Sequence, residues 1–315
     1  STQIKHGPFT TGGSLNYIST PIPSSKLNSV SLDIGSFGKT LMQVRSGDVL
    51  GNFAYLIELY SDKTDGFKEL DGGGDTGYGK TDFMTKLRYS FSESHALEFK
   101  YSMTDELSDE TYLGLTDADF SENPLRRYRA TALDEMDADH SQIMLSYAAK
   151  LNDNMSLAVV GYGNDFARNW YKLNKVNGMS LSSISKPTAD GWNEFYLLMN
   201  AENSADDAYR IKANNREYYS SGIQAVFNVL AGDHDIQAGL RIHSDEMDRF
   251  QWEDRYGMQS GQLVMTTQAT KGSDSNRIDS AEATALFVED RFTTGAMTIT
   301  AGARYEEITV KRDDW

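Results

Sequence analysis

The chain contains no cysteine, little proline and no long apolar run. Among its 315 residues cysteine is absent and proline occurs 5 times. Without cysteine there is no disulfide framework, thiolate metal site or cysteine nucleophile. A membrane-spanning helix needs about 20 consecutive apolar residues, and the mean hydropathy here is −0.52. A helical membrane protein is therefore excluded. A transmembrane β-barrel is not, because its strands need only about 10 residues, half of them polar.

Basic residues are in the minority. The chain has 46 acidic against 30 basic side chains and a net charge of −16. This excludes nucleic acid as the first choice of partner, because phosphate backbones require clustered Lys and Arg. No Walker loop, nucleophile elbow or dinucleotide fingerprint is found, so nothing supports enzymatic activity. The first residues show neither the basic n-region nor the apolar h-region of a signal peptide. We therefore expect that a signal peptide was removed or that the chain begins inside a longer protein.

Alternating apolar and polar residues predict about eleven antiparallel strands. The alternation is cleanest at residues 97–104, 236–243 and 297–306. Weaker runs of the same kind lie near residues 27–35, 39–46, 52–63, 80–92, 141–150, 155–168, 216–230 and 281–293.

The connections between these strands alternate between tight turns and long loops. The tight turns lie near residues 47–51, 92–95, 152–154, 231–234 and 294–295, and the long loops span 65–79, 105–140, 174–215 and 251–279. Only the first of the connections on the loop side, at 35–39, is short. Outer-membrane barrels sort their connections in this way, with short turns at one rim and large loops at the other. Charged residues in mid-strand indicate a polar lumen: Glu98, Lys100, Arg241, Arg304 and Glu306. We therefore predict an all-β, antiparallel, up-and-down transmembrane barrel.

Two segments resemble the TonB-dependent outer-membrane receptors. Residues 12–21 (GGSLNYISTP) are similar to the end of the family's plug domain, with Gly12, Gly13, Leu15 and Asn16 as its motif. Residues 111–120 (TYLGLTDADF) and 123–128 (NPLRRY) resemble the third extracellular loop of ferric-dicitrate-type receptors.

The resemblance implies a domain organisation and a function. Residues 1–24 would be the C-terminal end of a plug domain. Residues 25–315 would form the N-terminal half of the barrel, about 11 of 22 strands, so we expect the chain to be a fragment. The family's external loops bind a ferric chelate, such as iron dicitrate or a siderophore. The TonB–ExbB–ExbD complex drives its import through the plugged barrel, which lies in the bacterial outer membrane among lipid and lipopolysaccharide.

Candidate ligand-binding residues lie in the loop at 105–140, whose net charge is −8. Arg126, Arg127 and Arg129 are its only basic residues, and guanidinium groups bind carboxylates through paired hydrogen bonds. With Tyr112 and His140 they form the predicted site for an anionic chelate. In the alternative interpretation the arginines only neutralise nearby Asp and Glu, and the histidine is solvated or lines the lumen.

Other readings remain open. The acidic stretches at 71–75 and 134–139 offer oxygen ligands for Ca²⁺ without the spacing of an EF-hand, and no other metal or cofactor is predicted. Loop aromatics such as Trp170, Tyr171 and Trp192 would suit an oligosaccharide as the imported nutrient, or would belong to an aromatic girdle at the membrane. A passive porin is a further alternative, and a soluble extracellular β-sandwich binding module is the alternative from a different class.

Overall fold

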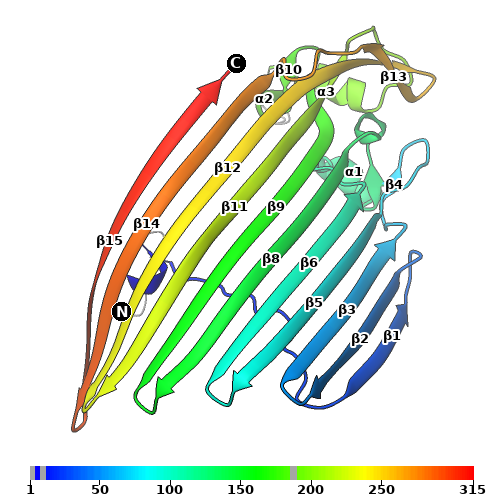
Figure 1. Cartoon of the computed structure of the whole chain (residues 1–315). Coiled ribbons are helices and arrows are strands. Elements are labelled where there is room, and N and C mark those ends of the chain that lie inside the picture. Colours follow the sequence, from blue (N-terminus) through cyan, green and yellow to red (C-terminus); the bar gives the residue numbers. More distant parts are fainter. Residues whose placement is uncertain (1–3, 8–11, 185–189) are drawn as a thin grey trace.

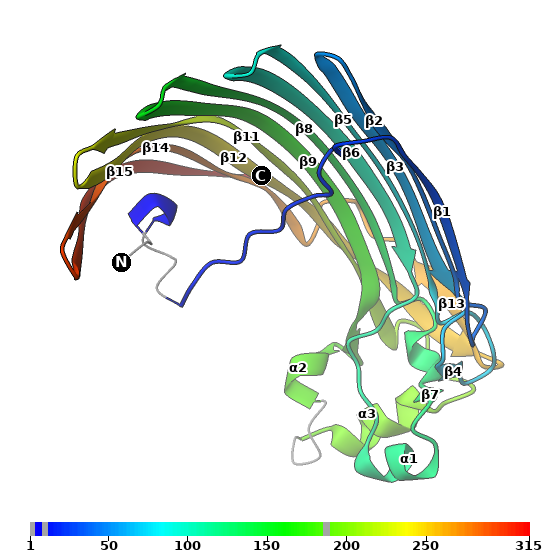
Figure 2. The same ribbon diagram turned by 90° about the horizontal axis from the view of Figure 1, so that it is seen from below.

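The computed structural model describes residues 4–7, 12–184 and 190–315. Its main sheet has thirteen strands, and eleven of them form a continuous antiparallel path in chain order, β1-β2-β3-β5-β6-β8-β9-β11-β12-β14-β15. The sheet curves into an open trough with β1 and β15 at its two edges (Figures 1 and 2). The predicted all-β, up-and-down architecture is confirmed as a partial barrel.

The elements have the following bounds. The strands of the path are β1 (Leu27–Ile34), β2 (Thr40–Leu50), β3 (Phe53–Thr64), β5 (Tyr78–Ser92), β6 (His95–Ser108), β8 (Glu135–Asn152), β9 (Met155–Val176), β11 (Tyr209–Ala231), β12 (His234–Gln259), β14 (Ser275–Thr294) and β15 (Met297–Asp314). The other elements are η1 (Ile4–His6), β4 (Glu69–Leu70), α1 (Asp117–Glu122), β7 (Arg126–Arg127), η3 (Arg129–Thr131), β10 (Met179–Ser180), α2 (Leu181–Ile184), α3 (Trp192–Met199) and β13 (Gln262–Thr267).

Connection length sorts by rim, as predicted, and the short connection at 35–39 between β1 and β2 is the exception at the loop rim. Two residues separate the strands at each tight turn of the described path, at 51–52, 93–94, 153–154, 232–233 and 295–296. Gly51 and Gly232 adopt positive φ values of 64° and 63° in these turns, a conformation that glycine reaches without steric cost. The long loops, which carry the helices, gather at the opposite rim (Figure 1).

The central strands are longer than the sequence pattern indicated. β9, β11 and β12 contain 22, 23 and 26 residues, whereas a membrane crossing needs about 9 to 11. The additional residues extend the strands past their predicted ends. There the strands still pair with one another, although apolar and polar residues no longer alternate in the sequence. The predicted loop at 105–140 is correspondingly shorter, and His140 lies on β8. Trp170 and Tyr171 lie on β9 and not in a loop.

The concave side of the sheet faces the described parts of the N-terminal segment: η1 lies beside β14 and β15, and residues 12–26 lead to β1 (Figure 2). Lys86 Nζ on β5 donates to the carbonyl of Ser19 at 3.2 Å, and Arg304 Nη1 on β15 donates to that of Ile4 at 3.4 Å. We call this side the inner face. The strand register places the charged mid-strand residues of the sequence prediction on it, because alternate residues of a strand share a face.

The outer face presents apolar side chains to the surroundings, as expected of strands in contact with lipid. Exposed examples come from nearly every strand of the path and include Ile57, Leu59, Leu87, Tyr89, Met103, Ile143, Leu145, Ile223, Ile242, Leu286, Val288 and Ile299. No helix in the described part of the chain has the length and apolar character needed to cross a membrane.

The main cluster of buried apolar residues lies at the loop rim. It is formed where η3, α2 and α3 pack on the extended ends of β9, β11 and β12, and its members include Tyr128, Leu173, Val176, Leu181, Ile184, Phe195, Met199, Tyr209, Ile211, Tyr256 and Met258. Figure 2 shows α1, α2 and α3 grouped at this one end. The loops therefore form a packed body above one rim of the sheet.

Candidate functional site

Four arginines stand side by side on the inner face, in the half of the strands nearer the loops. Arg216 on β11 lies directly opposite Arg168 on β9 and Arg249 on β12, and Arg249 lies opposite Arg277 on β14. We call these four residues the arginine row. Like charges directly opposite each other on neighbouring strands destabilise a sheet, so this alignment in a chain of net charge −16 carries an electrostatic cost that a bound anion would offset.

The arginine row has few anionic partners of its own. Arg277 Nε pairs with Asp279 at 3.0 Å. Within the described residues, Arg168, Arg216 and Arg249 form no ion pair. The Nε atoms of Arg216 and Arg249 are buried and have no hydrogen-bond partner. An unsatisfied buried donor is costly, and a carboxylate or another anion from outside the chain would relieve this cost.

A row of rings borders the arginine row on the side of the tight turns. Phe166 stacks on Tyr218 with 5.7 Å between ring centroids, and His140 contacts Phe166 edge-on at 6.2 Å. Arg216 Nη1 donates to Tyr218 Oη at 3.3 Å. The structure thus places the predicted residue His140 beside the arginine row, and on the inner face.

A further cation lies on the loop side of the row. Lys172 on β9 places its Nζ 3.8 Å from the ring centroid of Trp170 and 4.1 Å from that of Tyr112. Tyr112 Oη donates to the Leu173 carbonyl at 3.2 Å, and burial raises the pKa of this phenol to about 12. The predicted site residue Tyr112 therefore contacts a cation near the loops.

Arg126, the first predicted ligand residue, joins three loops. Its Nη2 pairs with Asp71 at 2.8 Å, its Nη1 pairs with Asp119 at 2.8 Å, and Nη2 also donates to Asn200 Oδ1. These partners precede β5, lie in α1 and follow α3. They are contacts of the kind that the neutralisation interpretation expects, and a ligand role for Arg126 stays a prediction.

Arg127 is buried within the loop body. Its Nε donates to Thr131 Oγ1 at 3.1 Å, and its Nη2 donates to the carbonyls of Thr131 and Asp134 at 2.7 and 3.0 Å. Burial lowers the pKa of the guanidinium and raises that of Asp134 to about 6. Arg129 Nε donates to the Asp71 carbonyl at 3.4 Å. The structure does not bring these arginines to the arginine row.

The sequence analysis missed the arginine row, although one pair in it could have been found. Arg216 and Arg249 lie at equal distances from the turn at 232–233, so a hairpin without a bulge must place them opposite each other. The other two pairings cross long loops, and no turn fixes their register in advance.

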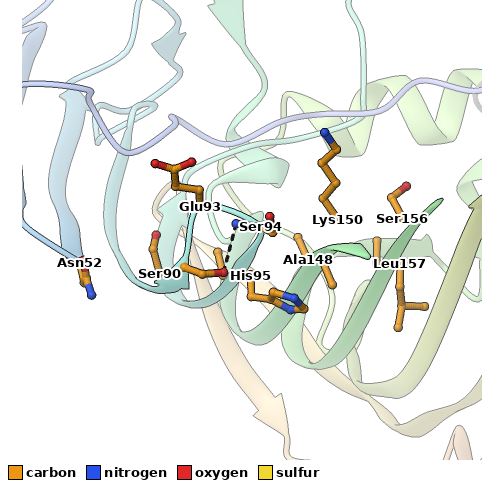
Figure 3. A pocket seen from close by; sticks show the side chains of 13 residues that line it. Asn52, Ser90, Glu93, Ser94, His95, Ala148, Lys150, Ser156 and Leu157 are labelled. Carbon is orange, nitrogen blue, oxygen red and sulfur yellow. Dashed lines mark hydrogen bonds between the residues drawn. The ribbon is translucent and has the colours of Figure 1, made fainter. Parts of the chain in front are cut away.

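A hollow at the tight-turn rim has a different character. It measures about 770 Å³ and is lined by Asn52, Ser90, Ser92, Glu93, Ser94, His95, Ala96, Ala148, Ala149, Lys150, Ser156, Leu157 and Ala158 (Figure 3). Among these lining residues Lys150 is the one lysine and there is no arginine, and Lys150 pairs with Asp153 at 2.7 Å. The hollow therefore lacks the clustered charge of the arginine row.

The acidic stretches of the sequence are dispersed by the fold. Asp71 pairs with Arg126, and Asp134 accepts hydrogen bonds from Thr111 Oγ1 and the Leu173 amide, both at 2.6 Å. Across the described ranges, no three His, Asp or Glu side chains form a group that could hold one metal ion.

Comparison with known proteins agrees with this architecture. The curved, up-and-down sheet with a polar inner face and an apolar outer face is the architecture of a transmembrane β-barrel. The family model "TonB dependent receptor-like, beta-barrel" matches residues 104–315, more than half of the chain. The chain belongs to this family, as the sequence resemblance predicted. No curated protein sequence matches the chain.

Solved structures of receptors share the fold at low sequence identity. The ferric citrate transporter FecA in its unliganded form is 17% identical with a TM-score of 0.74, covering 100% of this chain and 42% of that one. The ferric-catecholate import receptor Fiu from E. coli K12 is 13% identical with a TM-score of 0.69, covering 93% and 46%. The ferric yersiniabactin uptake receptor FyuA from Yersinia pestis is 11% identical with a TM-score of 0.66, covering 94% and 44%. The chain thus spans less than half the length of these proteins.

Proposed function

We propose that this chain is part of a receptor that imports an anionic ferric chelate across the outer membrane, driven by the TonB–ExbB–ExbD complex. Family membership supports the mode of import. The arginine row supports the charge of the ligand, because three of its four guanidinium groups have no anionic partner among the described residues and face the lumen side. That row is the observation on which the proposal rests.

The proposal includes a division of the chain. Residues 1–24 are assigned to the end of the plug, and residues 25–315 to the first half of the barrel. The course of the N-terminal segment along the inner face supports this, since Thr20 Oγ1 donates to Glu58 at 3.3 Å and Lys86 holds the Ser19 carbonyl. The motif at Gly12, Gly13, Leu15 and Asn16 precedes these contacts.

A polycarboxylate chelate of the ferric dicitrate type fits the row best. Guanidinium groups bind carboxylates through paired, charge-assisted hydrogen bonds. Neighbouring strands lie about 4.8 Å apart, so the row presents its forks over a breadth of roughly 15 Å. A ligand that carries several separated carboxylates can use more than one fork at once, whereas a neutral oligosaccharide would leave the cations unpaired.

Titration of ferric citrate into the full-length receptor that carries this chain tests the proposal. Each of Arg216→Gln and Arg249→Gln should weaken binding about tenfold or more, because a hydrogen bond to a charged group contributes roughly 1.5 to 3 kcal/mol. Arg88→Gln is the matched control, since Arg88 also lies on the inner face of the sheet but on β5, away from the arginine row. Heat modifiability on a gel shows that each variant is folded.

The same titration decides between the two arginine sites. Arg126→Ala and Arg127→Ala should also weaken binding at least tenfold if those residues hold the chelate. A dissociation constant that changes less than threefold in the Arg216 and Arg249 variants would remove the arginine row from the site. Absence of ferric citrate binding by the unmutated receptor would remove dicitrate as the ligand.

A further inference from the structure

A cationic cavity separate from the arginine row lies on the inner face, closer to the tight turns. It measures about 300 Å³ and is bounded by the N-terminal turn η1 and strands β11, β12, β14 and β15; its polar lining residues are Lys5, Gln224, Gln237, Arg241 and Arg304. We call it the lower pocket. Arg241 precedes Arg249 of the arginine row by eight residues on β12, which corresponds to about 26 Å along a strand.

The charge in the lower pocket is only partly compensated. Arg304 Nη2 pairs with Glu306 at 2.9 Å. Lys5 and Arg241 form no ion pair within the described ranges. Glu289 lies opposite Gln237 on the neighbouring strand but does not line the cavity. The pocket therefore offers two cations without a carboxylate partner, together with two side-chain amides.

Arg241 is held in place before any ligand arrives. Its Nε and Nη2 donate to Tyr162 Oη at 3.1 and 2.9 Å, and the same hydroxyl contacts His243 Nδ1 at 2.7 Å. Tyr162 reaches across β11 at Gly222, where a Cβ would stand 2.6 Å from the Tyr162 hydroxyl. A guanidinium group fixed in this way loses little entropy on binding an anion.

We propose that the lower pocket is a second anion-binding site, which takes carboxylate groups of the chelate after it has left the arginine row. This inference rests on the proposed function. The pocket lies where the N-terminal segment meets the sheet, and a ligand that passes between them must cross this boundary. Two cationic sites in succession would lower the barrier for an anion that must leave the first one.

Chemical labelling of Lys5 in the full-length receptor tests the lower pocket directly. An amine-reactive reagent is applied with and without metal-free citrate, and Lys5 modification is measured by peptide mass spectrometry. We expect citrate to protect Lys5 about fivefold or more in the unmutated receptor, because a bound carboxylate would engage its ammonium group. Arg241→Gln should abolish this protection, and Arg216→Gln should leave it intact. Equal labelling with and without citrate would overturn the proposal, even if ferric citrate binds the receptor.

Import measurements in cells separate passage from first binding. Arg241→Gln should leave the dissociation constant of ferric citrate unchanged but slow import at saturating ligand about tenfold. Arg241→Lys, which retains the charge, should restore most of the rate, and Arg88→Gln should match the unmutated receptor. If the lysine variant is as slow as the glutamine variant, Arg241 acts only by supporting Tyr162 and the proposal is wrong. If the unmutated receptor neither binds nor imports ferric citrate, the proposed function fails, and Lys5 labelling still decides on the pocket.

Discussion

Replacing Arg126 by methionine should loosen the loop body without unfolding the sheet. Arg126 is the shared partner of Asp71, Asp119 and Asn200, which belong to three different loops. Methionine retains much of the apolar stem over Tyr128, whose ring centroid lies 5.1 Å from the guanidinium carbon, but removes every hydrogen bond. The experiment therefore isolates the polar contribution of the side chain.

The magnitude follows from the burial of the partners. Asp119 is 5% exposed, and removing one partner of a buried ion pair costs about 3 to 5 kcal/mol. Tyr128, Thr116 and Tyr196 still donate to this carboxylate at 2.6, 2.7 and 3.1 Å, which reduces the loss. Asp71 is more exposed, and its pair contributes about 0 to 1 kcal/mol. We expect a total near 2 to 3 kcal/mol for local opening of the loops.

Hydrogen exchange in the full-length receptor measures this opening. Two amides report on the contact between β4 and β7: Glu69 N–H, which donates to the Leu125 carbonyl at 2.7 Å, and Asp71 N–H, which donates to that of Arg127 at 2.9 Å. Their protection should fall about 30-fold to 150-fold in Arg126→Met, since each 1.36 kcal/mol is a factor of ten. The protection of amides in the middle of β9 should not change in Arg126→Met. In the control variant Arg88→Met, the protection of the two reporter amides should not change. A change below threefold at both reporters would refute this account of the loop body.

Three further predictions concern other parts of the chain. Because burial raises the pKa of Asp134 to about 6, the folded loop binds more protons than the open loop between about pH 4 and 6. Its stability should therefore fall as pH rises through this range, and proteolysis of the loop should be slower at pH 5 than at pH 7 except in Asp134→Asn. Gly222→Ala should destabilise the receptor by about 1 to 3 kcal/mol through overpacking, measured as a lower unfolding temperature in detergent, whereas Gly161→Ala, where a Cβ meets nothing within 4 Å, should not. In intact cells, tags inserted at the loop rim, at Asn123, Asn177 and Ser260, should be reachable from outside. Tags inserted at the tight turns, at Asp153 and Gly232, should not be reachable, and labelling there would reverse the assigned orientation.

The sequence by itself determined the strands that face lipid and the order in which they pair. Lipid contact requires apolar side chains on one face, so alternation marks each crossing, as at Ile143 and Leu145 on β8. The tight turns leave two residues between partners, and this fixes hairpin register locally. The opposition of Arg216 and Arg249 could accordingly be derived from the sequence, and the sorting of loops by rim also followed from it.

The tertiary structure alone decided where the strands end and which distant residues meet. Beyond the membrane the strands are stabilised by pairing with neighbours, so no alternation is required there and His140 was wrongly placed in a loop. Arg168 and Arg277 join the arginine row across connections that contain helices or a further strand. Arg126 finds Asp71 and Asn200 at separations of 55 and 74 residues. Such contacts depend on how the loops pack together over their shared core. This packing involves residues far apart in the sequence, so no local sequence pattern encodes it.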